Sequence, residues 1–191
     1  MKNEVEKHIS LVLQNFINVT LLEVGRMKAK TIAFVALMAA LANVMSLPPL
    51  TIPIPLGAFT SSIHFFQLAI FLAAILAGPW AGLLSGAVGC LFMGVTRIPF
   101  IVGGIALLGA CTGLFAKRFR PVMASLLGFL VQLPYVLVTD YVWFTFFMGN
   151  PPSVALSIIA PIVVSLGLEA VACAVLADVI VHYLKNAGIT F

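Results

Sequence analysis

The sequence predicts an all-α integral membrane protein, a single bundle of six transmembrane helices with both chain termini in the cytoplasm. The first reason is composition: of the 191 residues, 62% are hydrophobic and only 8% are charged, and the mean hydropathy is +1.18. A soluble domain carries roughly 25% charged residues, so this chain has too little polar side chain to cover a water-soluble globule. The second reason is that its apolar runs are long and continuous, close to the roughly 20 residues that cross a bilayer as a helix.

Residues 1–26 precede the first of these runs and differ from it. Their apolar side chains follow helical spacing, but polar residues such as Gln14 and Glu23 interrupt any spanning segment. This pattern is typical of an amphipathic helix that lies in the membrane interface. A non-native extension is the alternative, because the residues from Met27 onward look like an ordinary N-terminus. The sequence therefore predicts an N-terminal extension, 1–26, and a membrane domain, 27–191.

Breaks in the apolar pattern set the ends of the first three spans. The first span follows basic residues and stops at a proline-rich stretch, 48–60, whose four prolines oppose a helix and favour extended backbone. The second span ends at the tight turn formed by Gly78, Pro79 and Trp80. The third span ends at a short link, 96–98.

The remaining spans are bounded in the same way. The fourth ends at the basic run 117–120 and the fifth at the loop 149–153, while the sixth is expected to tilt or kink at Pro161. In chain order the predicted spans are 31–47, 61–77, 81–95, 99–116, 121–148 and 154–184.

The basic residues fix the expected orientation. With the N-terminus in the cytoplasm, nine of the ten Lys and Arg residues fall on the cytoplasmic side and only Arg97 falls outside. Membrane proteins collect Lys and Arg in their cytoplasmic loops, so the net charge of +4 reflects membrane topology and does not indicate nucleic-acid binding. The nine are Lys2, Lys7, Arg26, Lys28, Lys30, Lys117, Arg118, Arg120 and Lys185. The stretch 48–60 then lies outside, as a plain connector or as a lid over an outward-facing pocket.

Small residues recur at helical spacing in two spans. The first set repeats every fourth residue in the third span, which predicts close packing inside the bundle. The second set occupies the first span as two small-x-x-x-small pairs, and it serves either internal packing or docking of another protein's helices. The first set is Gly78, Gly82, Gly86, Cys90 and Gly94, and the second is Ala29, Ala33, Ala36 and Ala40.

Ionisable residues inside a membrane are functional candidates by default. Asp140 and Glu169 lie within the fifth and sixth spans, and Trp143 follows Asp140 by about one turn. An acid beside a Trp suits a ring that carries a cation or hydrogen-bond donors. The alternative is a structural one, a buried pair with Arg97 or a protonated carboxyl satisfied by the backbone.

Other polar side chains are expected at the depth of Asp140 or a little further in, and together they outline a pocket open to the outside. The sequence contains no phosphate-binding loop, no metal-ligand spacing and no catalytic constellation. We therefore predict no catalytic residues, no metal and no cofactor. The predicted substrate-binding residues are Asn43, His64, Gln67, Arg97, Tyr135, Asp140, Trp143 and Glu169.

The chain resembles the substrate-binding S component of energy-coupling factor (ECF) transporters. The resemblance covers residues 27–187 and rests on size, six spans, the Ala-rich first span after basic residues, the long outer loop and the turn around Gly78-Pro79. It implies capture of a water-soluble vitamin from outside, with a transmembrane coupling subunit and two ABC-type ATPases as partners. It also implies that Ala36 and Ala40, with Ala29 and Ala33 second, dock the coupling subunit.

The vitamin is left open by the sequence. Asp140, Trp143 and Glu169 favour a thiamine-like ligand slightly, while riboflavin, folate, pantothenate, pyridoxine and queuosine precursors stay open. A carboxylate ligand such as biotin would require a cation, for which Arg97 is the outer candidate. The alternative functions are a proton-coupled secondary carrier and a small membrane enzyme, either of which would use Asp140 and Glu169.

Overall fold

The computed structural model describes residues 28–56 and 59–188, so the predicted N-terminal amphipathic helix lies outside the described residues. The elements in chain order are α2 (Ala29–Met45), η1 (Pro48–Leu50), β1 (Ile52–Leu56), β2 (Phe59–Ile63), α3 (Phe66–Ala77), α4 (Pro79–Gly89), α5 (Leu91–Thr96), α6 (Ile101–Phe115), α7 (Pro121–Val142), η2 (Trp143–Phe147) and α8 (Pro152–Asn186).

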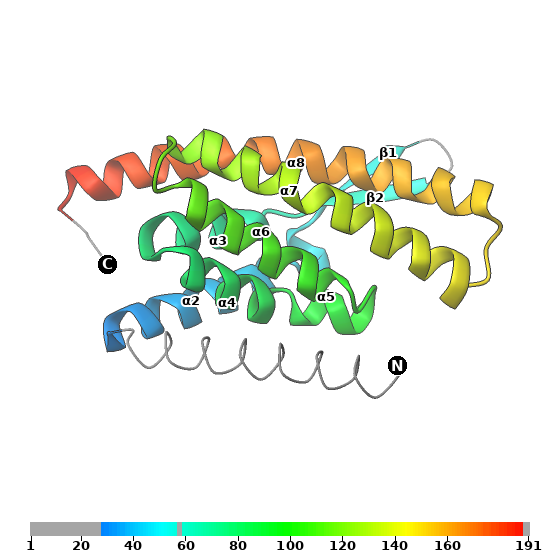
Figure 1. The fold of residues 1–191 in the computed structure, drawn as a ribbon, viewed down its shortest axis with the longest axis horizontal. Coiled ribbons are helices and arrows are strands. Elements are labelled where there is room, and N and C mark those ends of the chain that lie inside the picture. The colour runs from blue at the N-terminus through cyan, green and yellow to red at the C-terminus, as the bar shows by residue number, and fades with distance from the viewer. Residues whose placement is uncertain (1–27, 57–58, 189–191) are drawn as a thin grey trace, which may run out of the picture.

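The helices form one elongated bundle, as the sequence predicts. The long helices α7 and α8 lie side by side along one side of it, and α2 lies on the opposite side (Figure 1). The short helix α3 packs against α2, α4, α6 and α8 and is the most deeply buried. Its residues Ala69, Ile70 and Phe71 have no exposed surface, because nearly every residue of α3 is apolar and every face meets another helix.

Three helical segments are long and apolar enough to cross a membrane: Pro79–Thr96, Pro121–Phe147 and Pro152–Asn186. The other apolar helices, Ala29–Met45, Phe66–Ala77 and Ile101–Phe115, have 17, 12 and 15 residues. At 1.5 Å per residue even the longest of these three is shorter than the roughly 30 Å hydrocarbon core. The count of six spans therefore stays a prediction.

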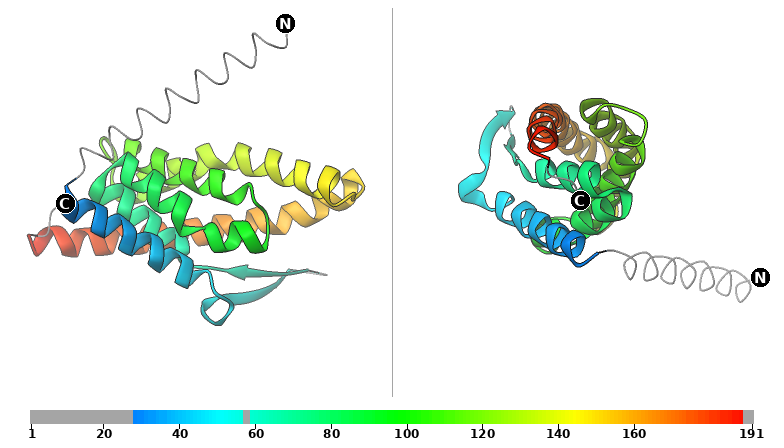
Figure 2. Two further views of the ribbon diagram at one scale, coloured as in Figure 1. Left: turned by 90° about the horizontal axis from the view of Figure 1, so that it is seen from below. Right: turned by 90° about the vertical axis from the view of Figure 1, so that its left-hand side faces the viewer.

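The predicted second span begins too early. Residues 61–63 belong to a β-hairpin in which β1 pairs antiparallel with β2, Ile52 opposite Ile63 and Leu56 opposite Phe59. Pro53 and Pro55 are compatible with the strand because β1 and β2 form a sheet of only two strands, so each strand has one unpaired edge. Figure 2 shows the hairpin running alongside the half of α8 that includes its N-terminus.

Two other predicted spans are not single uniform helices. The third is divided at Cys90, whose backbone leaves the helical region with φ −117° and ψ 16°, so α4 and α5 are separate helices. The fifth changes from α-helix to a π-helical turn at Trp143. The sixth is one helix, α8, which continues through Pro161 from Pro152 to Asn186. The tilt or kink expected at Pro161 stays a prediction.

Glycines bring α4 and α6 into direct backbone contact. A Cβ atom added to Gly82 would lie 2.3 Å from the carbonyl oxygen of Gly109, and one added to Gly86 would lie 2.5 Å from that of Ile105. Gly113 faces the backbone of Pro79 in the same way. The prediction that the glycine stripe serves internal packing is confirmed for these positions.

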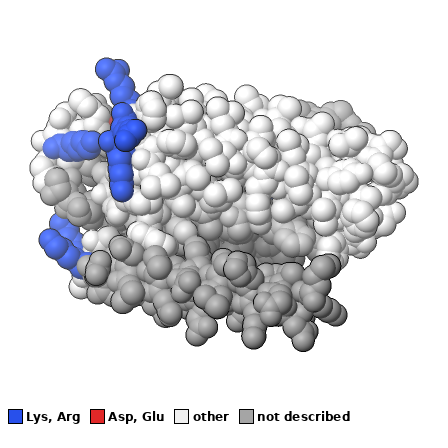
Figure 3. Space-filling view, in the orientation of Figure 1, with Lys and Arg blue, Asp and Glu red and all other residues white. Residues whose placement is uncertain are grey.

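The basic residues gather at one end of the bundle (Figure 3). This end carries the start of α2, the α6–α7 loop and the end of α8, and Figure 1 places all three together. Their basic side chains are exposed, and they are Lys28, Lys30, Lys117, Arg118, Arg120 and Lys185. We refer to this as the basic end, and to the end carrying the α5–α6 link and the hairpin as the opposite end.

Candidate functional site

A partly enclosed cavity of about 130 Å³ lies among α5, α6, α7 and α8, on the side of His64. Most of its lining is apolar, with Ile105 on α6 and Leu166 on α8 as examples. Four of the predicted binding residues line it, and they are His64, Arg97, Tyr135 and Asp140. The structure thus brings together half of the predicted set, from three different parts of the chain.

Helix α7 supplies the most polar wall. Gln132, Val136 and Asp140 follow one another at four-residue intervals on the buried side of α7, which places them on one face of the helix. Asp140 is 4% exposed, and no other residue in the described part of the chain gives it a hydrogen bond or an ion pair. The side-chain carbonyl of Gln132 is also buried without a partner there.

Tyr135 is held in place at the edge of this wall. Its hydroxyl donates to the backbone carbonyl of Phe100 over 3.2 Å, and its ring covers Gly103 and Gly104 of α6. A Cβ atom on Gly103 would lie 2.4 Å from the Tyr135 hydroxyl oxygen. The Tyr135 ring can pack against α6 only because Gly103 and Gly104 have no side chain there.

His64 and Glu169 meet on the other side of the cavity. One carboxylate oxygen of Glu169, Oε2, accepts a hydrogen bond from the His64 backbone N–H at 3.3 Å and lies 4.0 Å from the imidazole Nδ1. Glu169 is 1% exposed and comes from the middle of α8. His64 lines the cavity, whereas Glu169 lies behind it.

The position of Glu169 at the start of α3 explains its burial. Helix α3 begins at Phe66 with no side-chain cap and no acidic residue in its first turn. A helix N-terminus favours a negative group because its first N–H groups lack partners inside the helix. Glu169 reaches this part of the chain from α8, and the N–H that it accepts belongs to His64, two residues before Phe66. Its second carboxylate oxygen, Oε1, is buried without a hydrogen-bond partner in the described residues. Gln67, in the first turn of α3, is completely buried, and both polar atoms of its amide lack a partner in the described residues.

Two predicted residues lie elsewhere. The Asn43 amide donates to the carbonyl of Val88 at 2.8 Å and its oxygen accepts from the N–H of Phe92 at 3.2 Å, so it joins α2 to α4 and α5. Trp143 stacks on Phe147 with 5.2 Å between ring centroids and meets Phe100 edge to face at 6.1 Å. Because Phe100 lines the cavity, Trp143 borders it through that ring.

The expected alternative of a buried pair with Arg97 is not formed. Arg97 is exposed at the end of α5, where it lines the cavity, and within the described residues no carboxylate lies within ion-pairing distance of it. Gln132 and Thr139 line the cavity but were not among the predicted binding residues. Gln132 lies eight residues before Asp140 and Thr139 lies four residues after Tyr135 on the same helix, and this spacing is the signal that identifies them.

The alanine stripe of α2 faces outward. Ala29, Ala33, Ala36 and Ala40 are all exposed, while the buried side of α2 consists of Val35, Met38, Ala39 and Ala42. Of the two predicted uses of the stripe, internal packing is therefore wrong for the chain by itself. An exposed stripe of small residues allows another helix to approach closely.

Comparisons with known proteins agree with this architecture. The model of a family described as the S component of the ECF-type riboflavin transporter matches residues 26–186. No curated protein matches the chain in sequence. Among solved structures, the S component for biotin from an ECF-type ABC transporter has a TM-score of 0.52 and 17% identity, over 81% of this chain and 94% of its own. The S component of a bacterial ECF transporter has a TM-score of 0.50 and 20% identity, over 85% of this chain and 98% of its own. At these identities the structures support the fold alone.

Proposed function

The chain belongs to the family of S components of ECF-type riboflavin transporters, and on that premise we propose that it captures riboflavin or a closely similar flavin in the cavity beside Asp140. As an S component it is the substrate-binding subunit of a membrane transporter and not an enzyme. S components of ECF transporters work with a coupling component and ATPases. We propose that this chain does so as a multi-pass protein of the cell membrane with both termini in the cytoplasm.

The observation that carries the ligand proposal is the combination of an apolar cavity with unpartnered polar groups on one wall. A flavin ring is flat and largely apolar, and its edge carries one N–H donor between two carbonyl acceptors. Gln132, with a buried carbonyl that lacks a partner in the described chain, suits such an edge. The ribityl chain carries hydroxyl donors, which suit the carboxylate of Asp140.

The size of the cavity implies that its lining moves when ligand binds. Its volume, about 130 Å³, is below the roughly 300–1,000 Å³ typical of sites for small organic ligands. The aromatic group Phe100, Trp143 and Phe147 stands beside it, and two of the three belong to a π-helical turn, a feature often found at functional sites. We propose that this turn and the hairpin move outward to admit the ligand.

A thiamine-like cation is the second candidate, and the observation that favours it is the unpaired carboxylate of Asp140. An uncompensated buried charge is costly, and a cationic ring would offset that cost. A carboxylate ligand such as biotin is a third possibility because Arg97 lines the cavity. The proton-coupled carrier proposed from the sequence has less support, since Glu169 lies outside the cavity lining and accepts a hydrogen bond from the backbone N–H of His64.

Competition binding on the purified chain separates these candidates. We expect titration with riboflavin to saturate, as seen by quenching of its own fluorescence, and excess thiamine or biotin to leave that signal unchanged. Saturable binding of thiamine or biotin without binding of riboflavin would overturn the ligand proposal. It would leave the membership of the S-component family unaffected.

A further inference from the structure

At the basic end, α7 begins and α8 ends around a hollow of about 520 Å³ that is separate from the cavity described above. We propose that this hollow binds the headgroup of an anionic phospholipid, with phosphatidylglycerol as the fitting chemistry. The proposal concerns a lipid site and does not depend on which vitamin the protein binds. We call it the headgroup hollow; its polar lining comes from Arg120, Asp178, His182 and Lys185.

The first argument is depth in the bilayer. With 35 residues, α8 is about 52 Å long, roughly 22 Å more than the hydrocarbon core. If the excess is shared by both ends, about seven residues at the end of α8 lie among the headgroups. His182 and Lys185 fall in this segment, and Arg120 stands directly before the first turn of α7.

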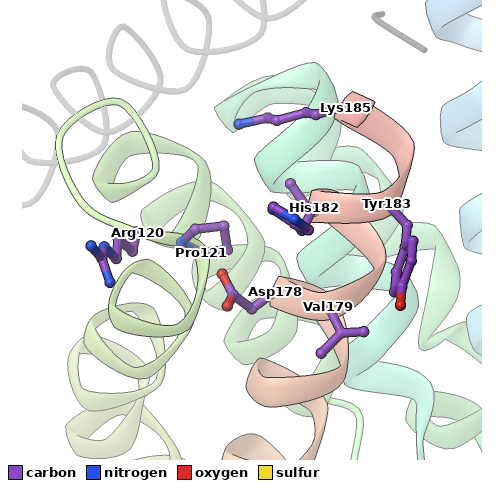
Figure 4. Close-up of a pocket in the computed structure, with 8 residues that line it drawn as sticks. Arg120, Pro121, Asp178, Val179, His182, Tyr183 and Lys185 are labelled. Atoms are coloured by element: carbon purple, nitrogen blue, oxygen red, sulfur yellow. The ribbon is translucent and has the colours of Figure 1, made fainter. Parts of the chain in front are cut away.

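The second argument is the geometry of the side chains. Asp178, His182 and Lys185 are spaced four and three residues apart, which places them on one face of α8. Figure 4 shows the three side chains reaching from α8 toward Arg120 and Pro121, while the ring of Tyr183 points away from them. The hollow is thus bounded by ionisable groups from two helices.

The third argument is that these charges do not neutralise one another. Within the described residues, Asp178 has no basic group within 4.0 Å, so Arg120 and Lys185 are left without it as an ion-pair partner. Arg120, Lys185 and Asp178 together carry a net charge of +1 when His182 is neutral. The first turn of α7 adds a positive helix terminus with no side-chain cap and no acidic residue.

An occupant of this hollow therefore needs one negative charge and neutral hydrogen-bond donors. The phosphodiester of phosphatidylglycerol matches Arg120 and Lys185, and its glycerol hydroxyls match the acceptor oxygens of Asp178. A free phosphate would supply the charge without the neutral donors. A zwitterionic headgroup would leave the net charge uncompensated.

The two helices that bound the hollow lie apart from the helix that carries the exposed alanine stripe. Helices α7 and α8 lie on the side of the bundle opposite α2, as Figures 1 and 2 show. A protein docked on the alanines of α2 would therefore leave this side in contact with lipid.

The test is titration of the purified full chain in detergent, with lipid adducts counted by native mass spectrometry. We expect a phosphatidylglycerol adduct that phosphatidylethanolamine and phosphatidylcholine do not form at equal concentration. The double variant Arg120→Gln, Lys185→Gln should weaken it by about thirtyfold, since each basic residue contributes about 1 kcal/mol. The control Lys117→Gln, Arg118→Gln removes the same charge from the same end, outside the hollow, and should leave the adduct in place.

A second pair of lipids tests the role of Asp178. Phosphatidylethanol has the charge of phosphatidylglycerol but no headgroup hydroxyls. We therefore expect the parent protein to bind phosphatidylethanol more weakly than phosphatidylglycerol, and the variant Asp178→Leu to bind the two lipids equally well. Equal loss of the adduct in both double variants would show attraction by charge alone and overturn the proposal. The proposal would also be overturned if soluble glycerophosphoglycerol bound as tightly as the lipid. It would likewise be overturned if the double variant Arg120→Gln, Lys185→Gln kept the lipid adduct but no longer bound the coupling component.

Discussion

At the scale of single residues, the two buried acids of the membrane region have different surroundings. Asp140 borders the cavity without a hydrogen-bond partner in the described chain, whereas Glu169 accepts the backbone N–H of His64. Both were predicted from the sequence as substrate-binding residues, because each is a single carboxylate inside an apolar helix. Their difference comes from the residues that lead into α3: the backbone N–H of His64 donates to Glu169, and no comparable group in the described residues donates to Asp140.

The substitution Asp140→Asn should weaken ligand binding without unfolding the protein. It keeps the size of the side chain and removes the charge from a hydrogen bond to ligand, so the expected loss is about 1.5 to 3 kcal/mol, roughly tenfold to a hundredfold in Kd. Ligand titration of the variant in detergent or nanodiscs measures it. Unchanged affinity together with a lower Tm would show that Asp140 has a structural role and no contact with ligand.

Glu169 should behave in the opposite way. The variant Glu169→Leu leaves the buried backbone N–H of His64 without its acceptor and should lower stability by about 1 to 3 kcal/mol, whereas Glu169→Gln retains an acceptor oxygen and should recover part of the loss. Thermal unfolding of both variants provides the comparison. A folded Glu169→Gln that no longer binds ligand would place Glu169 in the binding site, against this interpretation.

At the scale of elements, the packing of α4 on α6 depends on positions where a methyl group has no room. The substitution Gly82→Ala would bring a Cβ within 2.3 Å of the Gly109 carbonyl oxygen and must separate the two helices, so we expect a marked fall in Tm. Gly167→Ala in α8 is the control, because its nearest side-chain neighbour is the Phe129 ring at 4.0 Å. Helix propensity predicts that the control is neutral or stabilising; equal losses in both would refute the packing argument.

The hairpin is the element whose role the sequence left open between connector and lid. If the hairpin covers the site, shortening it within residues 53–60 should speed ligand release more than it slows binding, because a cover controls escape. Stopped-flow measurement of both rate constants on the shortened chain checks this. Equal rates in the parent and the shortened chain would leave the hairpin as a connector.

The elements show why some boundaries were predictable and others were not. Turn residues such as Gly78-Pro79 act locally, and α4 does begin at Pro79. The division at Cys90 and the strand β2 at Phe59–Ile63 depend on neighbouring elements: Asn43 of α2 accepts the N–H of Phe92, and β2 packs on α8. Hydropathy records how apolar a segment is and not where its helix must stop.

At the scale of the whole molecule, the sequence predicted that polar residues from several helices meet in one pocket, but it did not predict correctly which residues line that pocket. Asp140, Tyr135, His64 and Arg97 converge because the helices that bear them pack together. Asn43 was expected among them, yet its amide is used between α2 and the α4–α5 pair. A polar residue inside a helix bundle can bind ligand or join helices, and only the packing of its partners distinguishes the two.

The bundle as a whole exposes the alanine stripe of α2 on one side and encloses the cavity elsewhere. The variant Ala36→Trp should abolish association with the coupling component and leave ligand affinity unchanged, because Ala36 is exposed on α2 and does not line the cavity. Leu168→Trp is the control, because it also places a Trp at an exposed position, but on α8. Co-purification with the coupling component and a ligand titration measure the two functions on the same samples. If Ala36→Trp assembled normally, or if Leu168→Trp prevented assembly while Ala36→Trp did not, the partner would have to dock on another side, and the exposure of the four alanines would reflect contact with lipid.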